Sequence, residues 1–430
     1  MVRIETLTHL MGELEDQLVV CMKCGMCQAV CPVFSQTGRE ADVARGKLAL
    51  LEGLMQAMLD DPEGVQRQLN KCLLCGSCSA NCPSGVGVQE IFLKARAILA
   101  GYLGLSAAKR LILRGMLARP NLFDRLTEWG ARFQKFISRP ANDIIGTSCA
   151  RVVSPLLQGR HFRPLAKVPF HRQQPSLDRP ASTSGLKAAL FSGCLIDKLF
   201  PTIARATLQV LAHSGVGLFL PGGQGCCGIP AISSGDLATF RKLVAHNLKC
   251  FSKGRFDYLI TACATCTSTI REVWPILAAT ADQPAAAQLA AKTLDVSQFL
   301  VGKLGVPVLE QHLDAEKVVT YHDPCHLKKA LKVAAEPRAL IAANPAYRLV
   351  EMAEPDACCG MGGSFNLQYY EISRAIGRRK AEQIQATAAE VLATSCPACM
   401  VQISDMLSRE GARMAIRHPV ELYAEGLSQG

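Results

Sequence analysis

The sequence has few aromatic side chains and no long apolar segment. Phe, Trp and Tyr together make up 6% of the chain, and only two residues are Trp. A membrane-spanning helix needs roughly 18 or more consecutive apolar residues, and the best candidate, 258–270, is short and rich in Thr and Cys. We therefore expect a cytoplasmic protein, with peripheral binding at the inner face of the cell membrane as an open alternative.

Motifs for hydride and phosphate chemistry are also missing. The chain has no phosphate-binding loop, no catalytic triad and no evident flavin or nicotinamide fold. Gly360-x-Gly362-Gly363 lacks the full dinucleotide spacing and overlaps a cysteine motif. The chain by itself is not expected to accept a hydride, and whether it is an enzyme on its own stays open.

Cysteine, by contrast, is abundant, with 20 residues in a chain of 430. A secreted disulfide scaffold would be short and would follow a signal peptide, whereas this chain is long and starts with a polar segment. Eighteen cysteines fall in clustered motifs, and tight C-x-x-C spacing favours metal or redox chemistry. Only Cys149 and Cys250 stand alone, and both are interpreted as buried small hydrophobes.

Eight of these cysteines form two copies of one motif near the N-terminus. The copies are Cys21-x-x-Cys24-x-x-Cys27-x-x-x-Cys31-Pro and Cys72-x-x-Cys75-x-x-Cys78-x-x-x-Cys82-Pro. This is the bacterial ferredoxin spacing, in which the fourth cysteine ligates the other cluster. The prediction is one [4Fe-4S] cubane on Cys21, Cys24, Cys27 and Cys82, and a second on Cys72, Cys75, Cys78 and Cys31. A pair of zinc knuckles is the alternative.

The segments around these motifs are expected to be helical, because they are rich in Ala, Leu, Met and Lys. They are 1–20, 43–59 and 88–103. Between residues 91 and 173 lie 15 basic and three acidic side chains, which account for the whole net charge of +11. This basic segment is interpreted as a helical connector, with an acidic partner subunit or an anionic membrane surface as alternatives. It shows no nucleic-acid-binding module.

The second half of the chain repeats a five-cysteine pattern. One copy is Cys194, Cys226-Cys227-Gly228 and Cys263-x-x-Cys266; the other is Cys325, Cys358-Cys359-Gly360 and Cys396-x-x-Cys399. The cysteines are offset by 131, 132 and 133 positions. Five thiols per copy indicate a multi-iron cluster, with disulfides or a zinc site as alternatives. Each glycine permits the turn that brings two adjacent sulfurs to one centre.

Each copy alternates strands with helices, which predicts a parallel α/β sheet. The predicted strands are 187–192, 216–220 and 258–261 in copy one, and 318–321, 347–350 and 391–394 in copy two. Predicted helices include 201–213 and 237–251. Every cysteine group follows a strand, at the sheet edge where such folds bind ligands. The polar run His322 to His326 beside Cys325 has either a structural role or a role in tuning the cluster potential.

The order of these motifs resembles the iron–sulfur subunit of glycolate oxidase and of related D-lactate dehydrogenases. The cysteine-rich CCG subunits of heterodisulfide reductases look similar too. The resemblance covers nearly the whole chain except the basic connector. It implies one or two further [4Fe-4S] clusters in the CCG copies, non-cubane in the reductases. Some glycolate oxidase subunits have a degraded last C-x-x-C, whereas this chain keeps Cys396 and Cys399.

The expected architecture is a helical two-cluster ferredoxin domain (1–103), a basic helical connector and linker (104–185), CCG domain 1 (186–310) and CCG domain 2 (311–430). The resemblance implies an electron-transfer subunit in a hetero-oligomer with an FAD-linked oxidase subunit. Electrons from glycolate or D-lactate would pass to a quinone or another acceptor. The alternative is a heterodisulfide-reductase-like subunit that reduces a disulfide at a CCG cluster.

Overall fold

The computed structural model describes residues 2–151, 159–310 and 316–427. They divide into two compact units. The first, called here the helical unit, combines Met1–Ala118 with Gly228–Lys242 and Gly360–Gly377. The second, the α/β unit, contains Arg119–Cys227, Leu243–Cys359 and Arg378–Gly430. The domain boundaries given above stay predictions.

The helical unit is built from amphipathic helices around the two ferredoxin motifs. Its longer helices are α1 (Val2–Gly12), α5 (Ala44–Met55), α6 (Pro62–Asn70) and α8 (Val88–Leu103), and its short ones include α2 (Glu15–Leu18), α3 (Met26–Ala29), α4 (Phe34–Thr37) and α7 (Ser77–Ala80). Buried Leu51, Leu69 and Leu99 form part of its core. All three predicted helical segments contain helices: 88–103 coincides with α8, 43–59 contains α5, which ends at Met55, and 1–20 is divided between α1 and α2.

Two segments from the second half of the sequence complete this unit. They carry α14 (Ile229–Ile232) and α21 (Ser364–Gln368), which follow the two Cys-Cys-Gly motifs. Buried Arg96 in α8 donates hydrogen bonds to the carbonyls of Ser233 (2.7 Å), Leu69 (2.5 Å) and Cys72 (2.8 Å). One guanidinium therefore ties a ferredoxin motif to a segment that is more than 130 residues away in sequence.

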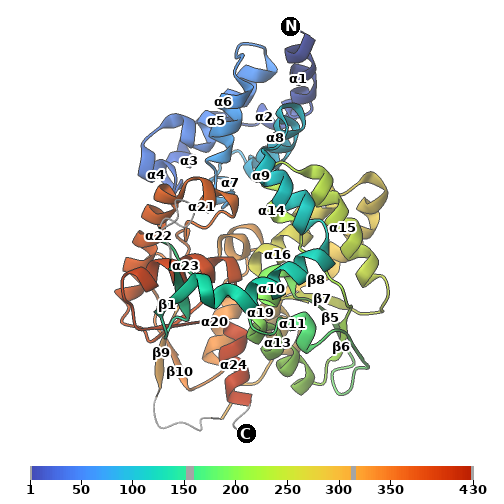
Figure 1. Cartoon of the computed structure of the whole chain (residues 1–430), viewed down its shortest axis with the longest axis vertical. Helices are drawn as coiled ribbons and strands as arrows, with labels where there is room; N and C mark the ends of the chain where they lie inside the picture. Colours follow the sequence, from blue (N-terminus) through green and yellow to red (C-terminus); the bar gives the residue numbers. More distant parts are fainter. Residues whose placement is uncertain (1, 152–158, 311–315, 428–430) are drawn as a thin grey trace. The chain divides into compact units, whose positions relative to one another are not determined.

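The α/β unit contains two parallel sheets of the same topology (Figure 1). Copy one has the order β4-β6-β5-β7-β8 and copy two the order β10-β9-β11-β12. The strands of copy one are β4 (Leu177–Arg179), β5 (Lys187–Phe191), β6 (Gly217–Leu220), β7 (Tyr258–Thr261) and β8 (Thr293–Asp295). Those of copy two are β9 (Lys317–Tyr321), β10 (Tyr347–Leu349), β11 (Val391–Ala393) and β12 (Ala415–Arg417). Only β4 runs antiparallel to its neighbour within these two sheets.

The six predicted strands are all present, and the predicted helices at 201–213 and 237–251 have the bounds of α13 (Pro201–His213) and α15 (Leu237–Phe251). The α/β fold class is thus confirmed. Edge strands β4, β8 and β12 were not predicted. Each has three residues, which is too short to show a hydrophobic period.

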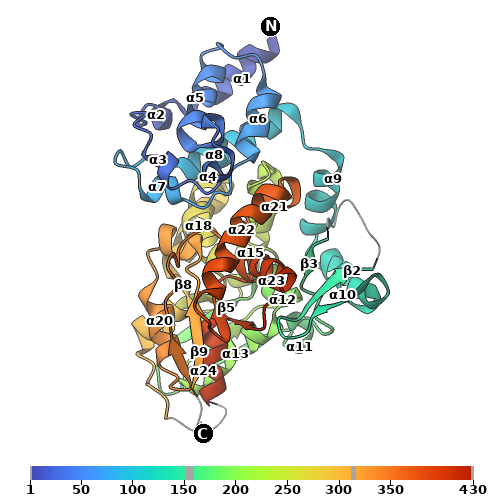
Figure 2. The ribbon, with the colours of Figure 1, turned by 90° about the vertical axis from the view of Figure 1, so that its left-hand side faces the viewer.

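The connector is not purely helical, contrary to expectation. After α10 (Pro120–Ile137), the chain forms an antiparallel sheet of β1 (Ser138–Asn142), β2 (Thr147–Ala150) and β3 (His161–Phe162). Figure 2 shows this sheet beside α10. Pro140 and the turn at Gly146 (φ 77°) disfavour a helix here. Residues 152–158 of the connector lie outside the described residues.

This small sheet packs on copy two. The hydroxyls of Thr147 and Ser408 lie 2.6 Å apart, and the backbone N–H of His161 donates to Asp405. Both partners lie on α23 (Pro397–Arg409), the helix that follows Cys396. The segment 104–185, predicted to be a connector and linker, also contributes β4 to the edge of the sheet of copy one.

Among the described residues, no single helix is both long and apolar enough to cross a membrane. One pair, α8 and the helix Ala107–Leu117, meets the test jointly but bends by 111° at its break.

Candidate metal centres

The two ferredoxin loops share one backbone conformation. Lys23 (φ 57°) and Leu74 (φ 54°) occupy the same motif position in the left-handed region, and each is followed two residues later by a left-handed glycine, Gly25 or Gly76. Side chains other than glycine adopt this region rarely. In the second loop the turn directs the backbone N–H of Leu74 at the Cys72 sulfur, 3.4 Å away. The loops are thus shaped to surround a group that bonds to sulfur.

The second motif and the last cysteine of the first line one cavity. Cys31, Cys72, Cys75 and Cys78 share its wall with Pro32, Val33, Leu73, Gly76, Val88 and Phe92, among others. Burial raises the pKa of the Cys31 thiol to about 11 and that of Cys78 further. Such thiols stay protonated unless a cation binds them, so the donor set fits a cationic iron centre. The grouping matches the predicted crossover of Cys31.

A buried cation lies on the wall of this cavity. Lys47 is 1% exposed, and its Nζ makes no hydrogen bond to a described residue. Burial lowers the pKa of Lys47, while the neighbouring Cys72 opposes that shift. Lys71 lies 3.8 Å from the buried Asp42 carboxylate on the same wall. Thiolates bound to iron would give Lys47 negative neighbours in addition to the Asp42 carboxylate.

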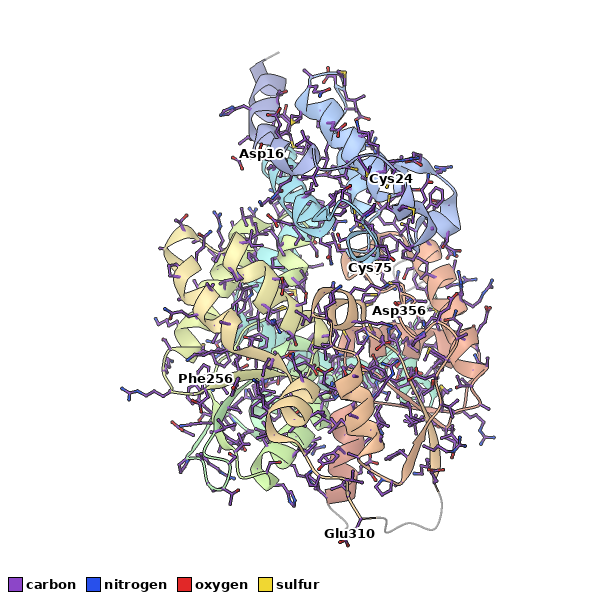
Figure 3. The ribbon with its side chains drawn as sticks, turned by 180° about the vertical axis from the view of Figure 1, so that it is seen from behind. Asp16, Cys24, Cys75, Phe256, Glu310 and Asp356 are labelled. Atoms are coloured by element: carbon purple, nitrogen blue, oxygen red, sulfur yellow. The ribbon has the colours of Figure 1, made fainter. Side chains whose placement is uncertain are left out.

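The other predicted set, Cys21, Cys24, Cys27 and Cys82, is nearer the surface. Cys24 is exposed, whereas its equivalent Cys75 is half-buried; both are labelled in Figure 3. Helices α3 and α7, which precede the last cysteine of each motif, pack together. Apolar side chains are exposed around the first motif, namely Val19, Val20, Met22 and Met26.

In copy one, the cysteines gather at the carboxyl edge of the sheet, as predicted. The Cys194 and Cys226 sulfurs lie 3.7 Å apart. Hydrogen bonding with Cys194 and Cys227, together with burial, raises the pKa of Cys226. The Cys266 thiol contacts Cys227 and Cys263, which raises its pKa likewise. The five cysteines Cys194, Cys226, Cys227, Cys263 and Cys266 therefore form one group.

The backbone around this group is held from both sides. Asn247 donates to the Cys226 carbonyl (3.0 Å), and the Trp274 indole N–H donates to the Cys227 carbonyl (2.8 Å). Gly228 has φ 95° and its counterpart Gly360 has φ 88°, which confirms the glycine turn expected after each cysteine pair.

Copy two repeats the arrangement. The Cys359 and Cys399 sulfurs lie 3.4 Å apart, and Cys359 also contacts Cys358. Cys399 in turn contacts Cys396. Two thiolates on one metal at about 2.3 Å stand roughly 3.7 Å apart, so this spacing suits shared metal ligation. Cys325 is buried and follows β9.

Copy two differs from copy one in the nitrogen-containing side chains that lie near its cysteines. His322 is fully buried, and one of its ring nitrogens lies within 4.8 Å of the sulfurs of Cys359 and Cys399. The repeat places Phe191 at this position in copy one, where it packs on Phe251 and Trp274. Buried Lys380 is a further neighbour of the Cys359 thiol.

The two copies meet at their cysteines. Cys263 of copy one is hydrogen-bonded to Cys396 of copy two. The Ala264 N–H donates to the Ser395 carbonyl at 2.9 Å, and Thr265 Oγ1 lies 3.4 Å from the Cys396 sulfur. The two cysteine groups are therefore adjacent. The sequence placed them on separate sheets and did not predict this contact, because nothing in the spacing sets how the repeats pair.

The isolated cysteines lie outside these groups. Cys250 is buried, as expected, and its sulfur contacts the carbonyl of Gly223. Cys149 is only half-buried in β2, where Arg139 Nε lies 3.4 Å from its sulfur. The expectation of full burial was thus wrong for Cys149, because β2 belongs to a small sheet near the surface.

Comparison with known proteins identifies the domains that carry these cysteine groups. Residues 17–86 match the 4Fe-4S dicluster domain family, and residues 188–271 and 319–404 each match the cysteine-rich domain family, CCG. A probable glycolate oxidase iron–sulfur subunit from Bacillus subtilis is 30% identical over 96% of this chain and 94% of its own. This chain belongs to that family. It is an iron–sulfur electron-transfer subunit.

Other relatives of this protein carry different names. A fumarate reductase (CoM/CoB) subunit from Methanothermobacter marburgensis is 27% identical over 91% of this chain and 68% of its own. Lactate utilization protein A from an Exiguobacterium strain is 31% identical over 56% of this chain and 98% of its own.

Proposed function

We propose that this subunit carries electrons away from a partner flavoprotein that oxidises a 2-hydroxy acid, glycolate or D-lactate, and delivers them to a quinone or another carrier. The names of the relatives support this substrate class. Bound iron–sulfur clusters supply one-electron transfer over a wide range of potentials. The single observation that carries the proposal is the grouping of the cysteines: Cys31 lines one cavity with Cys72, Cys75 and Cys78, and sulfur contacts link cysteines within and between the two CCG copies.

We assign the ligand sets as follows. In the helical unit, Cys72, Cys75, Cys78 and Cys31 hold one cubane, and Cys21, Cys24, Cys27 and Cys82 hold the other. In the α/β unit, each CCG copy holds up to one further [4Fe-4S] cluster. Its ligands are Cys194, Cys226, Cys227, Cys263 and Cys266 in copy one, and Cys325, Cys358, Cys359, Cys396 and Cys399 in copy two.

The protein's own residues serve three tasks in this scheme. The left-handed turn at Leu74 aims its backbone N–H at the Cys72 sulfur, and Lys23 has the same left-handed conformation in the first motif. Apolar side chains such as Phe92 exclude water from the cavity of Cys31. The exposed Cys24 and its apolar surroundings leave one end of the helical unit accessible to a redox partner in a hetero-oligomer.

A second candidate function is disulfide reduction at a CCG centre. The similarity to a subunit of a fumarate reductase (CoM/CoB) and the complete Cys396-x-x-Cys399 motif favour it. The two candidates differ in the substrate that exchanges electrons with the purified subunit. Reduction of a disulfide by the isolated chain with a reduced dye would support the second function.

The test is anaerobic purification of the native complex, followed by iron and sulfide analysis and paramagnetic resonance after addition of glycolate or D-lactate. We expect iron and sulfide for three or four [4Fe-4S] clusters and reduced-cluster signals after substrate is added. Cys31→Ser should remove the signal of one cubane and leave the other. Cys250→Ser is the control and should keep all the iron. Folded protein that contains zinc and no sulfide would refute the proposal.

A further inference from the structure

Helix α10 presents an apolar face to solvent. Trp129 is 62% exposed and Phe136 is 77% exposed, in a chain that otherwise has few aromatic residues. Leu122, Leu126, Phe133 and Ile137 are exposed on the same helix. Their spacing of three, four or seven residues places all six side chains within one stripe of the helix. None of the 18 residues of α10 is fully buried.

The opposite face of α10 is fixed to the α/β unit by its two acidic residues. Asp124 accepts from Lys198 at 2.6 Å, and Glu128 accepts from Arg172 at 2.8 Å and lies 2.9 Å from His171 Nε2. The Gln134 side chain adds hydrogen bonds to both the N–H and the carbonyl of Leu165. The helix is therefore oriented by specific polar contacts, with its carboxylates turned inward.

Only cations border the exposed stripe. Arg125 and Arg132 are seven residues apart and follow one edge of it, whereas Lys135 lies on the side of the helix that carries Asp124 and Glu128. All three are exposed, and none forms an ion pair within the described ranges. The outward face of α10 thus combines Trp, Phe and Leu with unpaired basic side chains and no free carboxylate. This is the composition of helices that lie in the interface of an anionic membrane.

We propose that α10 binds the surface of an anionic lipid bilayer, with its apolar stripe inserted at the level of the headgroups. The charge argues for lipid rather than for a protein face: a stripe that keeps every cation free and every acid paired complements a uniformly negative surface. Trp and Phe are also side chains suited to the interfacial region. The inference rests on the proposed function in one respect, because a quinone acceptor is itself dissolved in the membrane.

The experiment is flotation of the anaerobically purified holoprotein with vesicles of phosphatidylcholine, alone or with one quarter phosphatidylglycerol. We expect binding to the anionic vesicles and at least about 10-fold weaker binding of Phe133→Ser/Phe136→Ser, since each buried aromatic ring contributes a kilocalorie or more. Arg125→Gln/Arg132→Gln should weaken binding by about 10-fold or more, and added salt should weaken the wild type. Val308→Ser, at a residue 73% exposed elsewhere in the same unit, is the control and should bind normally.

Three results would overturn the proposal. They are the absence of vesicle binding, binding that the Phe133→Ser/Phe136→Ser variant retains, and loss of binding to the flavoprotein partner, rather than to lipid, in that variant. Iron content and substrate-dependent cluster reduction are measured on every sample in detergent solution. Failure of those two readouts would count against the proposed function, whereas failure of flotation alone would count against the role of α10.

Discussion

The fully buried Asp295 makes a specific prediction about pH. It ends β8 at the carboxyl edge of the copy-one sheet, where the repeat places His418 in copy two. One carboxylate oxygen accepts from the Ser297 N–H at 2.8 Å, and the other has no partner among the described residues. Burial raises the pKa of Asp295 from 3.8 to about 7.

The direction of the pH dependence follows from the linkage between proton binding and folding. The folded state holds the Asp295 proton more tightly than the unfolded state, so this group costs nothing below about pH 4 and destabilises the fold as pH rises toward 7. A shift of about three pKa units at 1.36 kcal/mol each gives a full penalty of about 4 kcal/mol above pH 7. Between pH 5.5 and pH 8 the penalty grows by about 2 kcal/mol.

Asp295→Asn should remove this penalty, because an amide stays neutral and can still accept from the Ser297 N–H. We expect the variant to unfold at a higher urea concentration than the wild type, by a margin that widens from pH 5.5 to pH 8. The assay is anaerobic urea unfolding, followed by far-UV circular dichroism at several pH values. A margin that stays constant with pH, or that narrows toward pH 8, would refute the assignment of the titration to Asp295.

Three further substitutions test the environment of the cysteine groups. Arg96→Met should lower the stability of the helical unit by about 3–5 kcal/mol, since it leaves three buried carbonyls without their donor. Limited proteolysis measures this loss, and Arg96→Lys should have a stability between those of the wild type and Arg96→Met. Lys47→Met should lower the reduction potential of the centre at Cys31 by on the order of 50–100 mV, because a buried cation favours the more negative reduced state. A redox titration in which this potential is unchanged or higher would contradict a charged Lys47 beside this centre. His322→Phe gives copy two the residue found in copy one and should change the paramagnetic resonance spectrum of the copy-two centre. The reverse change, Phe191→His, should alter the spectrum of the copy-one centre. Spectra identical to the wild type in both variants would show that the ring at this position does not influence the centres.

Much of the α/β unit could be predicted because its signals repeat. The boundaries of α13 and β7 were predicted to the residue. Their apolar and helical periods are bounded by cysteine motifs that recur at nearly constant offsets in the two copies. The crossover that brings Cys31 to Cys72 was predicted from ferredoxin spacing, and the cavity groups the same residues.

Other features depended on tertiary contacts that no local pattern encodes. The approach of Cys263 to Cys396 depends on how two sheets pair. The three-residue strands β8 and β12 are defined by their neighbours in the sheet. The apolar stripe of α10 did have a signal in the regular spacing from Leu122 to Ile137, but the sequence alone does not show that this stripe faces solvent rather than the core.

The composition of the helical unit has a consequence for the modularity of this protein. Because Gly228–Lys242 and Gly360–Gly377 complete that unit, a fragment that stops at residue 118 would leave the Arg96 guanidinium without the Ser233 carbonyl. Splitting the gene between the ferredoxin motifs and the CCG copies would therefore separate stretches of sequence that build one compact unit. Evolutionary exchange of the helical unit would have to change three stretches of sequence together.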